Sequence, residues 1–289
     1  MAQSNLPLEY AHFGQLPILG GVEMLQARYQ HMRFPKHIHE TYCIAVIEEG
    51  AQRFSRTGQQ HVAPKGDLLI VNAEDVHATD EVKADEGWGY QAIYPLPSLL
   101  KTLSAGVCSE AGTQPWFSQA VLHDPALAQQ FRWAFLLQGQ EKNTLLKETA
   151  LSTALVQLML RHARFVSAQP LLPISQQAVL RVQEYLHVDP TRDVSLTELA
   201  ELAQLSPWHF LRQFKRVVGM TPHAYLLQLR IRCARAALQA GKPIALVAQQ
   251  CGFTDQSHLN RHFKKTVGVT PGAFAAGLSK RRLAAAHVC

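Results

Sequence analysis

Residues 196–225 read LTELAELAQLSPWHFLRQFKRVVGMTPHAY, and residues 244–274 read IALVAQQCGFTDQSHLNRHFKKTVGVTPGAF. The second stretch repeats the pattern of the first. The residues that recur 49 positions later are Phe214, Lys215, Gly219, Thr221, Pro222 and, as Phe274, Tyr225. Two copies are too few for a solenoid, so we interpret them as a duplicated supersecondary unit.

Each copy predicts a short helix, a tight break and a longer helix. In the first copy Ser206 is a good N-cap, Pro207 suits the first helical position, and Gly219 suits the end of the helix. In the second copy Gly252 makes the turn and Asp255 caps the longer helix. This succession is typical of the helix-turn-helix, whose second helix enters the major groove of B-DNA.

The longer helices have an apolar stripe and a polar face. The stripes contain Phe210 and Phe214 in one copy and Leu259 and Phe263 in the other. The residues away from the stripes are Trp208, Arg212, Lys215, Arg216, Gln256, Ser257, Asn260, Arg261 and Lys264. Arg, Gln, Asn and Ser can read base edges. The alternative is a plain helical bundle with a solvated basic face, which the repetition of this face disfavours.

Net charge differs between the two parts of the chain. Residues 175–289 carry 15 Lys and Arg against 6 Asp and Glu, a net charge of +9, whereas residues 1–174 carry −3. A basic module on a mildly acidic body indicates a polyanionic partner. The segment 222–240 between the copies predicts a helix of about 28 Å. That length approaches the roughly 34 Å of one DNA turn, so it could hold two recognition helices in successive major grooves.

Residues 178–275 resemble the DNA-binding domain of the AraC/XylS family of bacterial transcription regulators. The resemblance rests on Ala200, the Ser206-to-Gly219 helix, Thr221-Pro222, the Arg230-to-Leu238 segment, Ile244 to Ala248, Cys251-Gly252-Phe253, Phe263-Lys264 and Gly268 to Pro271. It implies base contacts at Trp208, Leu211, Arg212, Gln256, Ser257, Asn260 and Arg261. Leu211 is apolar, so it either touches a thymine methyl or packs. Lys215 and Lys264 lie further along and are expected to contact phosphate.

The first part of the chain changes from strands to helices. Short apolar stretches predict strands over residues 17–95, with turns at Glu49-Gly50 and Thr57-Gly58 among others. Helical spacing predicts helices near 124–138 and 142–166, the first capped by Asp124. The apolar side chains Phe131, Trp133, Phe135 and Leu136 exceed one helix face. This predicts a homodimer; the alternative is that all four pack against the strands.

His37-Ile38-His39 is expected to begin a strand, with both imidazoles on one face together with Thr41 and Cys43. A later segment opens at Gly66-Asp67 and ends at His77. This layout resembles the two motifs of the cupin barrel, although Cys43 replaces a Glu ligand, and Asn72 and Glu74 replace the usual Pro and Gly. AraC-like regulators often carry such a domain as an effector sensor.

The resemblance implies an effector site in this barrel. Its predicted residues are His37, His39, Cys43, His77, Trp88 and Tyr90. The three histidines, with or without the thiolate, would suit zinc or another borderline divalent metal. Alternatively, they hydrogen-bond an organic effector or each other and the domain has no cofactor, a reading favoured by the frequent loss of metal in sensor cupins.

Composition excludes several classes of protein. Hydrophobic residues make up 47% and charged residues 17%, which is ordinary for a globular protein. No unbroken apolar stretch reaches the roughly 18 residues of a membrane helix, and the first residues do not resemble a secretory signal. The five cysteines are scattered without a CxxC pair, which fits a reducing compartment. We therefore expect a cytoplasmic protein.

The sequence predicts an α+β multidomain protein. Residues 1–166 form a cupin-like effector-binding domain that is also the candidate dimerisation domain, 167–177 a linker containing Pro170 and Pro173, and 178–280 an AraC-type double helix-turn-helix domain. We predict a sequence-specific DNA-binding transcription regulator, not an enzyme, that responds to a small-molecule effector. By family resemblance it is an activator that contacts promoter DNA and RNA polymerase. The alternatives are a metal-dependent cupin enzyme fused to a DNA-binding domain and an architectural DNA binder.

Overall fold

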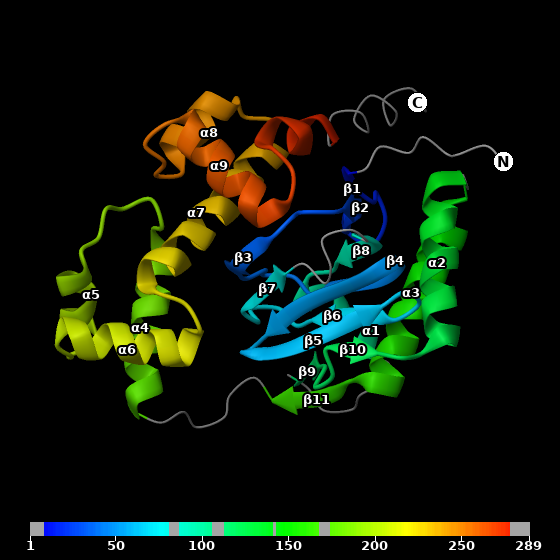
Figure 1. The fold of residues 1–289 in the computed structure, drawn as a ribbon, viewed down its shortest axis with the longest axis horizontal. Coiled ribbons are helices and arrows are strands. Elements are labelled where there is room, and N and C mark those ends of the chain that lie inside the picture. The colour runs from blue at the N-terminus through cyan, green and yellow to red at the C-terminus, as the bar shows by residue number, and fades with distance from the viewer. Residues whose placement is uncertain (1–8, 81–86, 106–112, 141–142, 168–173, 278–289) are drawn as a thin grey trace. The chain divides into compact units, whose positions relative to one another are not determined.

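The computed structural model describes residues 9–80, 87–105, 113–140, 143–167 and 174–277 (Figure 1). They form two compact units, the first up to residue 168 without residues 34–37, and the second from residue 169 onward together with residues 34–37. In the described residues, the first unit contains strands and three helices, and the second is mainly helical. We describe strand β3 with the first unit because it pairs with β7. Within the described ranges, no helix is both long and apolar enough to cross a membrane.

A large antiparallel sheet forms the body of the first unit. Its strands are β1 (Tyr10–Gln15), β2 (Glu23–Tyr29), β3 (Phe34–His37), β4 (Cys43–Arg56), β5 (Gln59–Pro64), β6 (Leu68–Val71), β7 (His77–Asp80), β8 (Trp88–Tyr94) and β10 (Val121–Leu122). The main path runs β1-β2-β8-β4-β6-β10, with β5 and β7 both paired to β4. The sheet thus curls into the barrel-like unit that the sequence predicts.

Strand β4 bends in the middle and belongs to both sides of the barrel. Its first part pairs with β6 and β8, and its last part pairs with β5 and β7. The register shifts between Ile47 and Glu49, and Gly50 has φ +60°. A Cβ at Gly50 would collide with the carbonyl of Gly87. The predicted turn at Glu49-Gly50 is therefore wrong: this Gly permits a bulge inside one long strand.

The turn predicted at Thr57-Gly58 is confirmed. Both residues have positive φ, 51° and 89°, and they join β4 to β5 in a tight hairpin. This is the primed turn type, whose twist matches that of the paired strands. Gly at the second position reduces the steric cost of that conformation.

Three helices accompany the sheet, and Figure 1 shows α2 and α3 side by side. They are α1 (Pro97–Ser104), α2 (Pro125–Gln140) and α3 (Thr144–His162). As predicted, Asp124 caps α2, and its carboxylate accepts from the Leu127 N–H at 3.1 Å. The predicted helix to residue 166 is too long, because residues 164–167 form strand β11 (Arg164–Ser167), which pairs with β9 (Thr113–Trp116).

The described part of the second unit consists of helices packed around aromatic cores. They are α4 (Ile174–Val188), α5 (Leu196–Leu202), α6 (Pro207–Val218), α7 (Pro222–Gln239), α8 (Ile244–Gln250) and α9 (Gln256–Val267), followed by a helical turn over 271–277. Helix α4 begins inside the predicted linker 167–177. Residues 168–173 of that linker, with Pro170 and Pro173, lie outside the described residues.

The sequence repeat is also a repeat in three dimensions. Ser206 caps α6 and Asp255 caps α9, 49 residues apart. The C-caps Gly219 and Gly268 have φ 81° and 85°, the left-handed conformation that Gly adopts readily. The rings of Phe214 and Tyr225 lie 5.7 Å apart, and those of Phe263 and Phe274 lie 5.4 Å apart. Each copy therefore has its own aromatic core.

Candidate DNA-binding surface and histidine cluster

Helix α6 presents an aromatic ring and a guanidinium group together. Trp208 is 62% exposed although it is large and apolar. The Arg212 guanidinium lies over its ring, 4.8 Å from the centroid. Such a cation–π contact limits the motion of a long side chain. Arg212 is therefore held on the N-terminal half of α6, the part of a recognition helix that meets base edges.

Helix α9 begins at a polar depression. The Asp255 carboxylate accepts from the His258 N–H at 2.7 Å and so satisfies one open amide of the helix end. A depression of about 220 Å³ at this end is lined by Thr254, Asp255, Ser257, His258 and Arg261. Sequence reasoning missed Thr254 and His258 in this surface, although their position beside the predicted cap was a usable signal.

The other predicted contact residues differ in exposure. Lys215, Arg216, Gln256 and Lys264 are exposed, whereas Leu211 and Asn260 are half-buried. Arg216 donates to the Gln213 side-chain oxygen at 2.6 Å. The half-buried state of Leu211 leaves both of its predicted roles, packing and methyl contact, open. These assignments to DNA remain predictions.

Arg230 of α7 ties the two copies together. Its guanidinium donates to the carbonyls of Pro190 at 2.9 Å and Arg192 at 3.1 Å, in the loop before α5. It also donates to the carbonyl of Gly252 at 2.8 Å, in the turn before α9. Gly252 has φ +75°, and a Cβ there would lie 3.1 Å from the Thr191 carbonyl oxygen, so this turn requires glycine. One side chain therefore fixes backbone in both helix-turn-helix units.

Arg212→Ala and Arg261→Ala are each expected to weaken binding to the specific site by about 1–3 kcal/mol. The reason is that a guanidinium group pairs with a base through two hydrogen bonds, which alanine cannot make. Gel shifts on the specific site and on random duplex DNA measure the effect. Arg181→Ala, an exposed arginine on α4, is the control and should change neither. Equal weakening on both DNAs would contradict base reading.

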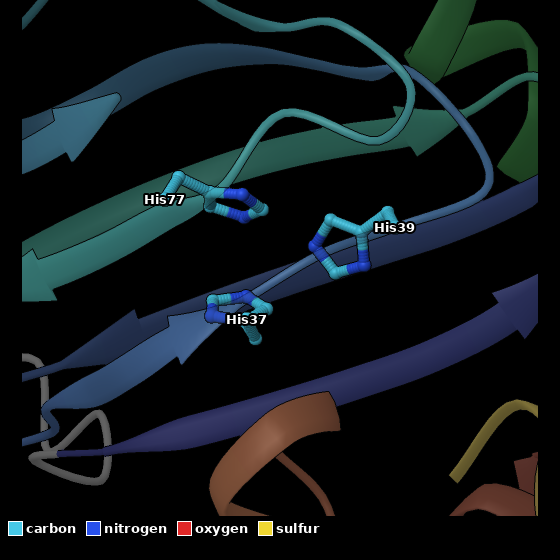
Figure 2. Close-up of side chains that lie close together, drawn as sticks. All are labelled: His37, His39 and His77. Atoms are coloured by element: carbon cyan, nitrogen blue, oxygen red, sulfur yellow. The ribbon is translucent and has the colours of Figure 1, made fainter. Parts of the chain in front are cut away.

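Three histidines lie together in the barrel (Figure 2). One possible ligand atom from each of His37, His39 and His77 lies within 4.8 Å of the others. The rings of His39 and His77 are 4.8 Å apart, and the Glu74 N–H donates to the His39 carbonyl at 2.7 Å. The expected strand start is wrong: β3 ends at His37, and His39 lies in the following loop. Its proximity to His77 comes from that loop rather than from strand alternation.

The remaining predicted effector residues are Cys43, Tyr90 and Trp88, two aromatic rings and one thiol. Burial raises the pKa of the Cys43 thiol to about 12, and its hydrogen bond with Tyr94 lowers the pKa in part. Burial likewise raises the pKa of Tyr90, which also bonds to Tyr94. The Tyr94 ring is 5.5 Å from that of His39, so it connects this group to the histidines. Cys43 is a protonated thiol outside the histidine group, so a thiolate ligand is not supported.

Trp88 extends the same group. The Tyr29 ring lies 5.7 Å from Trp88 and 6.3 Å from Tyr90. Trp88 is 1% exposed, and its Nε1 has no hydrogen-bond partner in the described part of the chain. A buried N–H donor without a partner is costly and suits a site where a polar ligand or water binds. Sequence reasoning missed Tyr29 and Tyr94, because pairing between distant strands places them here.

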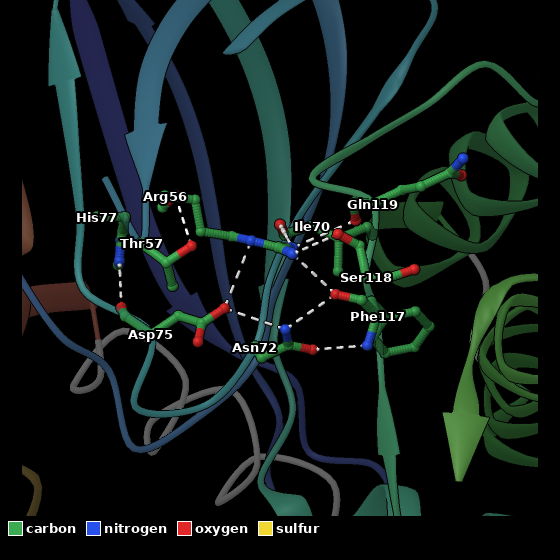
Figure 3. Close-up of polar contacts among 9 residues, drawn as sticks. All are labelled: Arg56, Thr57, Ile70, Asn72, Asp75, His77, Phe117, Ser118 and Gln119. Atoms are coloured by element: carbon green, nitrogen blue, oxygen red, sulfur yellow. Dashed lines mark hydrogen bonds and ion pairs between the residues drawn. The ribbon is translucent and has the colours of Figure 1, made fainter. Parts of the chain in front are cut away.

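A buried arginine supports the loop that leads into β7 and its first residue, His77 (Figure 3). Arg56 donates to four carbonyls, those of Ile70, Phe117, Ser118 and Gln119, at 2.8–3.2 Å. Its Nε lies 3.4 Å from the Asp75 carboxylate. The Asp75 backbone carbonyl in turn contacts His77 Nδ1 at 2.9 Å. Asn72 also bonds to Asp75 and to the backbone of Phe117. The loop before β7 is therefore fixed to residues 117–119.

The fold and these two surfaces define a class of protein, a double helix-turn-helix transcription regulator with a barrel domain for a ligand. A family model described as a helix-turn-helix domain matches residues 199–277, and one described as an AraC-like ligand binding domain matches residues 19–155. The chain belongs to the AraC family of transcription regulators.

Curated relatives match this chain over most of their own length. The HTH-type transcriptional regulator YbfI of Bacillus subtilis is 32% identical over 78% of this chain and 82% of that protein. The HTH-type transcriptional activator RhaS of Shigella sonnei is 26% identical over 82% of this chain and 85% of that protein.

Solved structures of ToxT from Vibrio cholerae share the fold. The apo form of a ToxT variant matches with a TM-score of 0.57 at 12% identity, over 96% of this chain and 100% of that chain. ToxT bound to an unsaturated fatty acid matches with a TM-score of 0.56, also at 12% identity, over 96% and 99%. At this identity the likeness extends to the fold alone.

Proposed function

We propose that this protein is an effector-controlled transcription activator that recognises two adjacent half-sites on duplex DNA. The observation that carries the proposal is the equivalence of α6 and α9: each is capped at its start, ends at a left-handed Gly and exposes an arginine one turn into the helix. Helix α7, with 18 residues, is about 27 Å long, close to one DNA turn. By this proposal the protein acts in the cytoplasm and activates by contact with RNA polymerase.

The barrel binds the effector in this proposal. The support is the continuous group from the histidines through Tyr94 to Tyr90 and Trp88. A ligand preferring one arrangement of the two units would shift the population of the DNA-competent form. RhaS, a relative of this chain, is named as an activator, which favours activation over repression here.

A small-molecule effector is expected to stabilise the full chain. At 100 times its dissociation constant, a ligand of the folded state adds about 2.7 kcal/mol to the free energy of unfolding. A thermal-shift screen of small metabolites detects this. Tyr90→Phe and Tyr94→Phe, which remove the bonded hydroxyls, should reduce the shift without changing DNA affinity. Tyr10→Phe, on β1, is the control. An identical shift in wild type and both variants would place the ligand elsewhere.

We propose further that α2 and α3 form a homodimer interface. In α2, Phe131 and Phe135 are 0% and 5% exposed, whereas Trp133 and Leu136 are 48% and 55% exposed. The alternative that all four pack against the barrel is therefore wrong. Leu160 of α3 is also 52% exposed. Exposed apolar side chains on adjacent helices favour association, and a symmetric dimer would bind repeated DNA sites.

Trp133→Glu combined with Leu136→Glu is expected to convert the dimer to a monomer, because burying two carboxylates in an apolar interface is costly. Sedimentation velocity at micromolar concentration measures it. Val62→Glu, a substitution at an equally exposed apolar residue on β5, is the control and should leave the dimer intact. If the wild-type chain sediments as a monomer, the interface proposal fails while DNA recognition stands.

The second candidate function, a metal-dependent enzyme fused to a DNA-binding domain, has less support. The barrel brings together three imidazoles without a carboxylate among the grouped ligands. The relatives are named as transcription regulators. We therefore propose a sensor rather than a catalyst.

A further inference from the structure

We propose that His37, His39 and His77 bind one divalent metal ion in the barrel. Of the described residues, these form the one group of three or more His, Cys, Asp or Glu whose ligand atoms converge, all within 4.8 Å of one another (Figure 2). His37 and His77 lie on paired strands, β3 and β7, and His39 is two residues beyond His37. The group is therefore built by the fold and not by chance contact of surface side chains.

The hydrogen bonds of two rings fix the tautomer that a metal requires. His37 Nδ1 is 2.7 Å from the Pro35 carbonyl, and His77 Nδ1 is 2.9 Å from the Asp75 carbonyl. A carbonyl only accepts, so each Nδ1 carries the hydrogen and each neutral ring has its lone pair on Nε2. Metal-binding histidines commonly donate a hydrogen bond from their other ring N–H to a backbone carbonyl in this way, which also orients the ring.

The surroundings hold these rings in place. His37 and His77 are buried, with 4% and 7% of their surface exposed, so the surrounding chain limits the motion of both rings. The carbonyl that orients His77 belongs to Asp75, which Arg56 and Asn72 anchor. Outer partners of this kind are typical supports of metal sites. A cluster of interchangeable solvent-exposed histidines would have no such support.

The donor set selects the class of metal. Three neutral imidazoles suit zinc, nickel, cobalt or iron(II) rather than calcium or magnesium, which prefer oxygen ligands. Zn–N bonds are about 2.0–2.1 Å, so two nitrogens on one ion lie at most about 4.2 Å apart. The possible ligand nitrogens of the three rings now lie within 4.8 Å of one another, so small inward rotations of the rings would meet this requirement. Three protein ligands leave a position for water or for an oxygen of an effector.

The proposal is tested on the full chain without an affinity tag. Purified protein is analysed for metal, then stripped and titrated with Co²⁺, whose visible absorption reports its ligands. We expect about one ion per chain. His39→Gln and His77→Gln should each weaken Co²⁺ binding by at least about 100-fold, because each removes a ligand. His39 is half-buried and so is the substitution that the fold tolerates more easily.

The control is His12→Gln, which removes an exposed histidine on β1 and should leave the affinity unchanged. Circular dichroism and gel-shift affinity identify any variant that fails to fold. Absence of Co²⁺ binding by the folded wild-type chain, or equal binding by the His39→Gln variant, would overturn the proposal. The metal is measured without DNA or effector, so this outcome would leave the proposed regulatory function intact.

Discussion

Affinity for the specific DNA site is expected to fall about 1,000-fold between 50 and 200 mM salt. Residues 175–289 carry a net charge of +9, and Lys215 and Lys264 are exposed at equivalent positions on α6 and α9. Six or more phosphate contacts release condensed counterions when the protein binds, and added salt opposes that release. A gel-shift titration against salt concentration measures the slope.

Single lysines should each account for a part of that slope. Lys215→Ala and Lys264→Ala are each expected to reduce the slope of log affinity against log salt by about 1. Each should also weaken binding to specific and random DNA alike. This separates phosphate contacts from the base contacts assigned to Arg212 and Arg261. An affinity that does not change with salt would contradict the assignment of this basic unit to DNA.

Arg56→Met is expected to destabilise the barrel by about 3–5 kcal/mol, because it removes one partner of a buried ion pair. Arg56 and Asp75 side chains are 6% and 7% exposed. Methionine would also leave four carbonyls, those of Ile70, Phe117, Ser118 and Gln119, without their guanidinium donor. This loss is a large fraction of the roughly 5–15 kcal/mol of a typical domain. Urea unfolding of the full chain measures the change.

Two further variants control this measurement. Arg53→Met changes an exposed arginine on the same strand and should alter stability by less than about 0.5 kcal/mol. Adding Asp75→Asn to Arg56→Met removes the uncompensated carboxylate, so the double variant should be less destabilised than the sum of the two single variants. If Arg56→Met unfolds like the wild type, the guanidinium does not support the loop before β7.

Local chemistry made the second unit predictable. Ser206, Asp255, Gly219 and Gly252 act on backbone within a few residues, and the structure places each cap and turn where the sequence predicts it. The repeat adds a second, independent copy of each signal. The role of Arg230 was not predicted, because its three carbonyl partners lie 22 to 40 residues away in the sequence.

The barrel was less predictable because pairing between distant strands decides it. The signal at Glu49-Gly50 indicates a local bend but cannot distinguish a turn from a bulge inside a strand. His37 and His39 do not share a strand, yet the loop after β3 still places them with His77. Arg56 was missed, although Gln52, Phe54 and Arg56 alternate on the buried face of β4. An arginine at an inward position signals a buried partner.

The central proposal is that two helices, α6 and α9, each read one half of a DNA site. Selection from a random duplex pool with the purified full chain tests this most directly. We predict an enriched site with two half-sites about 10 base pairs apart, one turn of DNA. Selection with Arg212→Ala should relax one half and selection with Arg261→Ala the other. A pool that shows no enrichment, or one in which both substitutions relax the same bases, would contradict recognition by two helices.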